Sequence, residues 1–211
     1  MRLGLLGGTF DPIHHGHMAV ARSAAACGMD RVLLVPARRP PHKEREGIMD
    51  PFHRFAMVAL ATTSDERLGV SPFELARTET SYTIETVRHF LGAGHQVTLI
   101  MGSDSLVELE SWRECRALLD LAGVLAYPRM PYLPAELPQR LPAWIRSRLD
   151  PGWDAAGAIR ILNGSPVDAS STEIRDRLTA GKPVTGLVPA ATEEYIRKHG
   201  LYAPLPEGRT D

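Results

Sequence analysis

The sequence predicts an α/β fold, a doubly wound parallel sheet with helices on both faces, in a single domain. Short apolar runs alternate along the chain with segments of helical period, which is the pattern of a parallel sheet covered on both faces. The length of 211 residues suits one such Rossmann-like domain, with a core large enough to need no disulfide bridges.

The apolar runs predict the strands. They lie near Leu3–Leu6, Arg31–Val35, Val97–Met101, Gly123–Ala126 and Ile159–Leu162, with a possible short strand at Leu68–Val70. Most are rich in Val, Leu and Ile and are too short for helices. Strands buried on both faces have this composition, so a parallel sheet is favoured.

Helical periodicity predicts the helices. They lie at His17–Cys27, Pro51–Thr63, Thr83–Leu91, Ser105–Leu109, Arg113–Leu119, Ser171–Thr179 and Ala190–His199. Asp50 before Pro51 is a typical N-cap followed by proline at the first helical position. Gly28, Gly92 and Gly181 stand where the ends of helices are expected, since glycine favours the C-cap.

Two stretches interrupt the alternation. Residues 38–47 form a proline-rich, basic segment after a predicted strand, which suggests a loop that faces a ligand. Residues 127–153 contain six prolines and are expected to run over the surface, with one helix near Trp144–Leu149. We assign residues 1–203 to the domain and expect the polar tail, residues 204–211, to be flexible.

Composition excludes several classes of protein. A net charge of −1 gives no general attraction to nucleic acid or to an anionic membrane. Cys27 and Cys115 are the only cysteines, which argues against a disulfide framework and favours a reducing cytoplasm. No apolar run approaches the ~18 residues of a membrane span, and the first is too short for a signal sequence. The oligomeric state, monomer or homo-oligomer, stays open.

The most informative segment is residues 7–17, Gly-Gly-Thr-Phe-Asp-Pro-Ile-His-His-Gly-His, directly after the first strand. Gly7 and Gly8 let backbone N–H groups approach an anion closely, and the following helix offers free N–H groups and a positive dipole end. His14 and His17 share one face of the first turn and can point at the same phosphate. His15 projects about 100° away and is expected to face solvent. A polyphosphate site is therefore predicted.

Zinc ligation by His14 and His17 is the main alternative. The nearest carboxylate, Asp11, precedes Pro12 and is expected to lie outside the helix, and no cysteine is close. The turn also lacks the glycine spacing of redox dinucleotide enzymes and the lysine of a Walker loop. Phosphate binding is the favoured interpretation.

Three further loops follow strand ends: residues 38–43, 102–105 and 170–175. Because ligands of open parallel sheets bind outside the carboxyl ends of the strands, we expect these loops to converge on the glycine turn. Lys43 would supply a cation, although a lone lysine is usually only solvated. Asp104 could cap a helix or bind ribose hydroxyls.

Other candidates also have ordinary structural explanations. Ser171 and Thr172 are typical of a helix N-cap, but Arg175 on the same turn could bind phosphate oxygens. Trp112 could belong to the core or stack on a planar heterocycle. We assign the remaining cysteines and tryptophans to packing: Cys27, Cys115, Trp144 and Trp153.

Residues 7–17 resemble the signature of the HxGH nucleotidyltransferase superfamily. Further motifs are similar to those of the bacterial nicotinate-nucleotide adenylyltransferases, in order and along nearly the whole chain. They are Pro-Pro-His-Lys at 40–43, Ser-Tyr-Thr at 81–83, Gly-Ser-Asp-Ser-Leu at 102–106 with Trp112, Ser-Ser-Thr-x-Ile-Arg at 170–175, Tyr195-Ile196 and Gly-Leu-Tyr at 200–202. Ala169 departs from the family, which usually has a bulkier apolar residue there.

The resemblance implies a reaction in NAD biosynthesis: ATP and nicotinate mononucleotide give deamido-NAD and pyrophosphate. It implies Mg²⁺ held mainly through ATP phosphates, with no protein residue assigned as a metal ligand. The implied catalytic residues are His14, His17, Lys43 and Arg175. The implied ATP-binding residues are Gly7, Gly8, Thr9, His14, His17, Gly102, Asp104, Ser171, Thr172 and Arg175. The implied pyridine-nucleotide-binding residues are Thr9, Phe10, Lys43, Tyr82, Thr83 and Trp112.

This chemistry needs no general base. The attacking phosphate has a second pKa near ~6 and is mostly ionised at neutral pH. Alignment of two anions and neutralisation of developing charge suffice, so we expect the histidines to hold and neutralise the triphosphate without moving protons. Three alternatives stay open: preference for nicotinamide mononucleotide, another HxGH transferase such as one acting on phosphopantetheine, and a non-catalytic nucleotide sensor.

Overall fold

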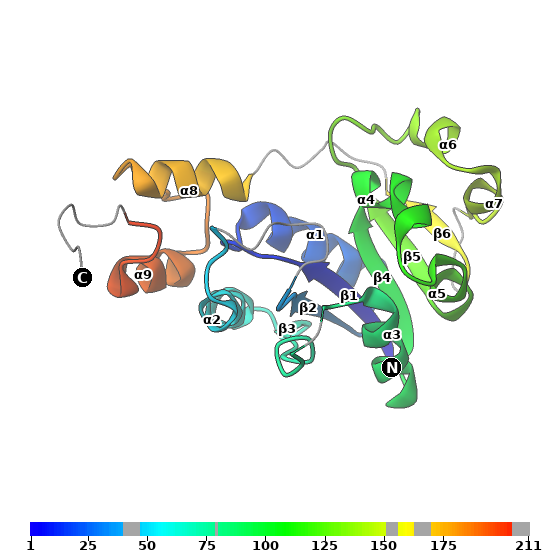
Figure 1. Cartoon of the computed structure of the whole chain (residues 1–211), viewed down its shortest axis with the longest axis horizontal. Coiled ribbons are helices and arrows are strands. Elements are labelled where there is room, and N and C mark those ends of the chain that lie inside the picture. The colour runs from blue at the N-terminus through cyan, green and yellow to red at the C-terminus, as the bar shows by residue number, and fades with distance from the viewer. Residues whose placement is uncertain (40–46, 79, 151–155, 163–169, 204–211) are drawn as a thin grey trace.

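A computed structural model describes residues 1–39, 47–78, 80–150, 156–162 and 170–203 (Figure 1). Within this part of the chain, one six-stranded sheet has the order β3-β2-β1-β4-β5-β6, and all its neighbouring strands are parallel. The strands are β1 (Arg2–Gly8), β2 (Arg31–Pro36), β3 (Leu68–Val70), β4 (Gln96–Gly102), β5 (Gly123–Tyr127) and β6 (Ile159–Ile161). The predicted fold class and all six predicted strands are confirmed.

The described residues also form helices between and after the strands. They are α1 (His15–Ala26), α2 (Pro51–Thr62), α3 (Thr83–Gly92), α4 (Ser103–Val107), the 3₁₀ turn η1 (Leu109–Ser111), α5 (Cys115–Leu121), α6 (Leu137–Arg140), α7 (Ala143–Arg146), α8 (Ser171–Thr179) and α9 (Ala190–His199). The helix expected near Trp144–Leu149 is the short α7, and α6 was not predicted.

Helices cover the sheet on both faces because neighbouring side chains of a strand point to opposite faces. In β1, Leu5 belongs to a core cluster with residues of α3 and α5, such as Val87 and Leu118. Leu6 belongs to a second cluster with residues of α1, α2 and α9, such as Met57. The sheet is therefore doubly wound, as expected.

Strand β1 lies between β2 and β4. From β1 the chain passes to β2 and β3 on one side, then returns to β4 on the other side. The turns after Gly8 and Gly102, at the ends of β1 and β4, therefore stand next to each other where the winding reverses. Ligands of such sheets bind at this point.

Several helices begin or end where the capping residues in the sequence predict. The Asp50 carboxylate accepts a hydrogen bond from the Phe52 N–H (2.8 Å), with Pro51 at the start of α2. Gly28 and Gly181 follow the last residues of α1 and α8 with positive φ values of 93° and 65°, a conformation that suits glycine. Both helices end as the glycines predict.

Two predicted boundaries are wrong. Gly92 lies inside α3, and the left-handed residue is Gly94 (φ 82°). The helix expected from Arg113 begins only at Cys115, because Glu114 has φ 53°, which a right-handed helix cannot contain.

Three further expectations concern membrane-spanning helices, the two cysteines, and the C-terminal tail together with Trp153. No helix of the described residues is both long and apolar enough to cross a membrane. Cys27 and Cys115 are free thiols. The predicted tail, residues 204–211, and Trp153 lie outside the described residues.

Candidate active site

The turn after β1 is shaped by its glycines and by Phe10. Gly7 is exposed, and a side chain built there would meet no atom within 4 Å, whereas one at Gly8 would come within 2.9 Å of the Phe10 ring. Phe10 is buried and has φ 51°, the left-handed region that costs a non-glycine residue energy. The buried ring therefore lies directly beneath the turn backbone, and Gly7 leaves the outer side open to a ligand.

His14 and His17 cap the start of α1 reciprocally. Nδ1 of His14 accepts from the His17 N–H, and Nδ1 of His17 accepts from the His14 N–H, both at 3.4 Å. The two rings stack with centroids 3.7 Å apart. Since Nδ1 acts as acceptor in both rings, the proton of each neutral imidazole is assigned to Nε2. The pair thus presents two stacked imidazoles, each with an Nε2–H donor, at a helix N-terminus.

His14 is neutral at physiological pH. Burial, the largest cause, together with the positive charge of Arg129 and the neighbouring His15, lowers its pKa from 6.5 to about 4. His14 can therefore meet a phosphate oxygen as a neutral donor. Positive charge at this site has to come from other residues. His15 itself is exposed, as expected.

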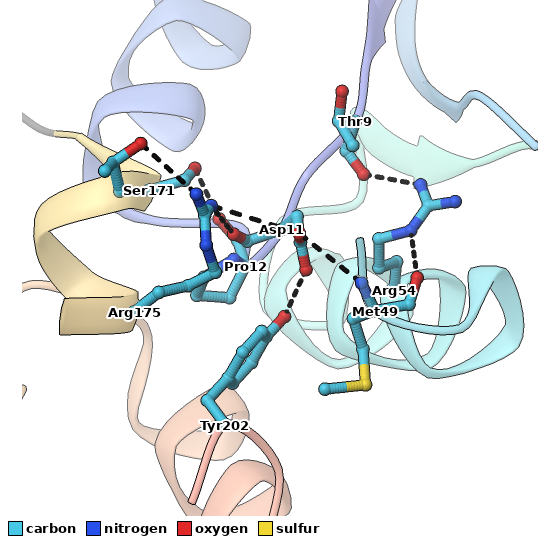
Figure 2. A network of polar contacts seen from close by, with 9 residues as sticks. Thr9, Asp11, Pro12, Met49, Arg54, Ser171, Arg175 and Tyr202 are labelled. Carbon is cyan, nitrogen blue, oxygen red and sulfur yellow. Dashed lines mark hydrogen bonds and ion pairs between the residues drawn. The ribbon is translucent and has the colours of Figure 1, made fainter. Parts of the chain in front are cut away.

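Helix α8 is bonded to the turn before α1 (Figure 2). The Ser171 hydroxyl donates to the carbonyl of Pro12 (3.0 Å), and Arg175 donates from Nη1 to the carbonyl of Asp11 (2.7 Å) and from Nη2 to the Thr172 hydroxyl (3.3 Å). These contacts bring residues some 160 positions apart to the same place. The convergence of this loop with the glycine turn is observed.

The capping interpretation of Ser171 and Thr172 is wrong. The N-cap of α8 is Ser170, whose side chain makes no capping hydrogen bond. The Ser171 hydroxyl is used for the contact with Pro12, because the helix end packs against the turn and tertiary contact outweighs the local cap.

Asp11 is the residue that the sequence analysis missed. Its buried carboxylate accepts hydrogen bonds from the Tyr202 hydroxyl (2.7 Å) and the Met49 N–H (3.5 Å), and Arg175 Nη1 lies 3.9 Å from it (Figure 2). It is thus a structural acceptor that joins three distant segments. The Gly-Leu-Tyr motif at 200–202 was the available signal, but nothing in the sequence pairs it with Asp11.

Just after the end of β4, the Asp104 carboxylate contacts the neighbouring backbone and a guanidinium. Its Oδ1 accepts from the Ser105 N–H (2.9 Å), and its Oδ2 pairs with Arg129 Nη1 (3.2 Å). A side chain at Gly102 would collide with the Asp104 carboxylate. The buried Ser103 hydroxyl bonds the backbone of Arg129 and Tyr132. Arg129, which was not predicted, is therefore a cation at the edge of the site.

The aromatic candidates lie on the α3 side of the molecule. Tyr82 precedes α3, its ring lies 4.6 Å from the guanidinium of Arg113, and Trp112 follows η1. Both rings are half-buried and pack against the core cluster of that face. Thr83 is the first residue of α3. Lys43 lies outside the described residues.

The described residues include no group of three or more His, Cys, Asp or Glu side chains that could hold a metal ion. The donors around the glycine turn are backbone N–H groups, imidazoles and a guanidinium, which are poor ligands for Mg²⁺. The Asp11 carboxylate already has the three partners described above. The zinc alternative for His14 and His17 finds no third ligand here.

Comparisons with known proteins agree with this geometry. The model of the cytidylyltransferase-like family matches residues 5–177. A probable nicotinate-nucleotide adenylyltransferase of Chromobacterium violaceum is 38% identical over 208 residues, which is 95% of this chain and 98% of the relative. One of Neisseria gonorrhoeae (strain NCCP11945) is 40% identical over 206 residues, with the same shares.

A solved structure shares the fold. It is the Plasmodium falciparum nicotinic acid mononucleotide adenylyltransferase complexed with NaAD, which has a TM-score of 0.71 and 18% identity, over 95% of this chain and 97% of that one. At this identity the likeness concerns the fold.

Proposed function

This chain belongs to the cytidylyltransferase-like family and, within it, to the nicotinate-nucleotide adenylyltransferases; from that premise we propose that it transfers the adenylyl group of ATP to nicotinate mononucleotide. The products are deamido-NAD and pyrophosphate, in NAD biosynthesis. The observation that carries the proposal is the pair of capping histidines, with two Nε2–H donors at a helix N-terminus where the winding of the sheet reverses.

The reaction is a displacement at phosphorus. A phosphate oxygen of nicotinate mononucleotide forms a bond to the α-phosphorus of ATP, and the bond from that phosphorus to the bridging oxygen of the β-phosphate breaks. The electron pair leaves with pyrophosphate. Because the attacking phosphate is mostly ionised at neutral pH, the protein has to align two anions and stabilise charge, and needs no general base.

On the ATP side, His14 and His17 donate from Nε2 to phosphate oxygens, and the backbone of Gly7, Gly8 and Thr9 lines the same oxygens. Fixed donors of this kind lower the barrier because they are already oriented toward developing charge. Two observations support these roles. A side chain at Gly7 would meet no atom within 4 Å, and the imidazole rings of His14 and His17 are stacked.

Arg175 supplies positive charge to the leaving pyrophosphate, with Ser171 and Thr172 beside it. A guanidinium has five N–H donors, so Arg175 can bind a phosphate oxygen while it keeps its bonds to the Asp11 carbonyl and to Thr172. Lys43 has the same role in the proposal, on the resemblance alone.

The nucleoside parts of the two substrates bind further along the strand ends. Asp104 accepts from ribose hydroxyls beside Gly102, in exchange for part of its pairing with Arg129. Tyr82, Thr83 and Trp112 form the pyridine site, where the half-buried indole stacks on the ring.

Mg²⁺ belongs to the substrate in this proposal. When bound, the ion neutralises charge on the phosphates of ATP. Phosphate and water oxygens hold it, since the donors that the described residues offer around the glycine turn are a poor fit for Mg²⁺. A cytoplasmic location, where ATP is available, completes the proposal.

The test is pyrophosphate release from ATP and Mg²⁺, followed with each candidate acceptor separately. We expect release with nicotinate mononucleotide, together with deamido-NAD by chromatography, and none with ATP alone. A higher kcat/KM for nicotinamide mononucleotide would change the assigned substrate, and release with phosphopantetheine would change the enzyme class. ATP binding without release for any acceptor would support a nucleotide sensor and contradict the proposal.

A further inference from the structure

Arg54 of α2 is a buried cation that the reaction described above does not use. Its side chain is 1% exposed and is the largest of the fully buried side chains among the described residues. Each of its nitrogens donates to a backbone carbonyl: Nη1 to Thr9 (2.6 Å), Nη2 to Ala37 (2.8 Å) and Nε to Met49 (2.9 Å). Figure 2 shows the bonds to Thr9 and Met49.

Burying a guanidinium costs free energy, because the charge loses its contact with water. Burial lowers the pKa of Arg54, and the negative charge of Asp11 offsets that effect only in part. An apolar side chain such as methionine would fill the same volume without desolvating a charge. The value of arginine here is geometric, because its planar fork holds three acceptors in fixed directions at once.

The three carbonyls come from three segments at the carboxyl edge of the sheet. Thr9 belongs to the turn after β1, Ala37 directly follows β2, and Met49 directly precedes the N-cap of α2. The Ala37 N–H also donates to the Gly8 carbonyl (2.9 Å). Arg54 therefore ties the glycine turn to the chain on both sides of residues 38–47, the loop that the sequence predicts to face a ligand.

The hydrogen bond from Arg54 to the Thr9 carbonyl also orients the peptide group between Thr9 and Phe10. A trans peptide carries its C=O and its N–H on opposite sides. Since the Thr9 carbonyl points to Arg54, the N–H of the same peptide, on Phe10, is directed away from α2. Phe10 has φ 51°, a conformation that persists only when its surroundings hold it. Arg54 is one of those surroundings.

We propose that Arg54 is a positioning residue for adenylyl transfer, which acts through the Thr9 carbonyl to keep the N–H groups of the glycine turn directed at the reacting phosphates. This inference rests on the proposed function. Without Arg54 the Thr9–Phe10 peptide is free to rotate, and its N–H leaves the ligand side. Misplacement by about 1 Å far from the chemistry can cost about 100-fold in rate.

The main variant is Arg54→Lys, which keeps the charge but lacks the planar fork that reaches three separate carbonyls, with Arg54→Met as the second variant. The control is Met57→Ala, one turn further along α2 in the core cluster that also contains Phe10, which destabilises the core but removes no hydrogen bond to the turn. All variants are assayed at a temperature where circular dichroism shows them folded. We expect kcat of Arg54→Lys to fall about 10- to 100-fold, with KM for ATP changed less than kcat, and kcat of Met57→Ala to stay within about twofold of the parent.

Hydrogen–deuterium exchange gives a readout that does not depend on activity. The peptide that covers residues 7–13 should exchange faster in Arg54→Lys, and the peptide that covers β4 should not. Unchanged kcat in Arg54→Lys, an equal kcat loss in Met57→Ala, unchanged exchange at 7–13, or failure of both Arg54 variants to fold would each overturn the positioning role. A parent enzyme that forms no deamido-NAD would instead contradict the proposed function.

Discussion

His14 and His17 use one hydrogen-bond pattern for two purposes. Each ring caps a backbone N–H of α1 with Nδ1, which leaves the tautomer with the proton on Nε2. In both rings Nε2–H is then the donor, and the rings are stacked with their centroids 3.7 Å apart. The observed helix cap and the proposed phosphate donor are therefore coupled in these two residues, so a substitution that keeps only one of these functions distinguishes them.

His17→Ala is expected to lower kcat by about 100-fold or more, because it removes a donor that stabilises charge in the transition state. Steady-state kinetics with both substrates measures the loss. His15→Ala is the matched control, since His15 is exposed on the same turn and its variant should keep nearly full kcat. An unchanged kcat for His17→Ala would remove His17 from the catalytic machinery.

The low pKa of His14 predicts how stability depends on pH. The unfolded His14 titrates near 6.5 and the folded one near 4, so the unfolded state binds more protons between these values. The contribution is fully present above pH 6.5 and is lost as the pH falls toward 4, by roughly 3 kcal/mol at most. Urea unfolding at several pH values should show this loss.

The comparison variant is His14→Asn, which keeps a capping side chain but does not titrate. Its free energy of unfolding should fall less than that of the parent over the same pH range. Parallel curves for the two proteins would mean that His14 is not the group responsible.

At the scale of elements, the segment from η1 to α5 shows where sequence patterns reach their limit. Periodicity located the helix, but its start depends on Glu114, which turns the chain with a positive φ and pairs with Arg88 at 2.6 Å. The partner lies on α3, and no local pattern contains it. Trp112, between η1 and α5, packs against the core cluster of that face.

Trp112→Ala is expected to raise KM for nicotinate mononucleotide much more than KM for ATP, because the indole stacks on the pyridine ring in the proposed site. Trp144→Ala is the control, since that indole packs against the same core cluster without a proposed ligand role. Initial rates with each substrate varied in turn separate the two effects. A larger change in KM for ATP would contradict the stacking role.

At the scale of the whole molecule, the sequence predicted the class of fold and the sites of the strands because both depend on local composition. It also predicted that loops distant in sequence would meet at the ends of β1 and β4. The sequence did not predict the direct contacts of Asp11 and Arg54. A buried carboxylate and a buried guanidinium find their partners only through the fold, and a lone Asp or Arg gives no periodic signal.

The contact of Tyr202 with Asp11 joins the two ends of the described chain. Tyr202→Phe removes the hydroxyl that donates to the buried carboxylate (2.7 Å), and we expect a loss of about 1–3 kcal/mol in the free energy of unfolding. Tyr195→Phe, which removes a hydroxyl 2.9 Å from His53 Nδ1 at a half-buried site, should cost less. Chemical unfolding compares them, and equal losses would refute a special role for Asp11.

The span of that contact also has a consequence for the newly made protein. Asp11 and Tyr202 are 191 residues apart in the chain, so β1 and the glycine turn are synthesised well before Tyr202. On the ribosome, where folding begins from the N-terminal side, the turn exists long before its acceptor network is complete. The hydrogen bonds of Asp11 are thus complete only after residue 202 has left the exit tunnel, so the turn reaches its final surroundings only once nearly the whole domain has been translated.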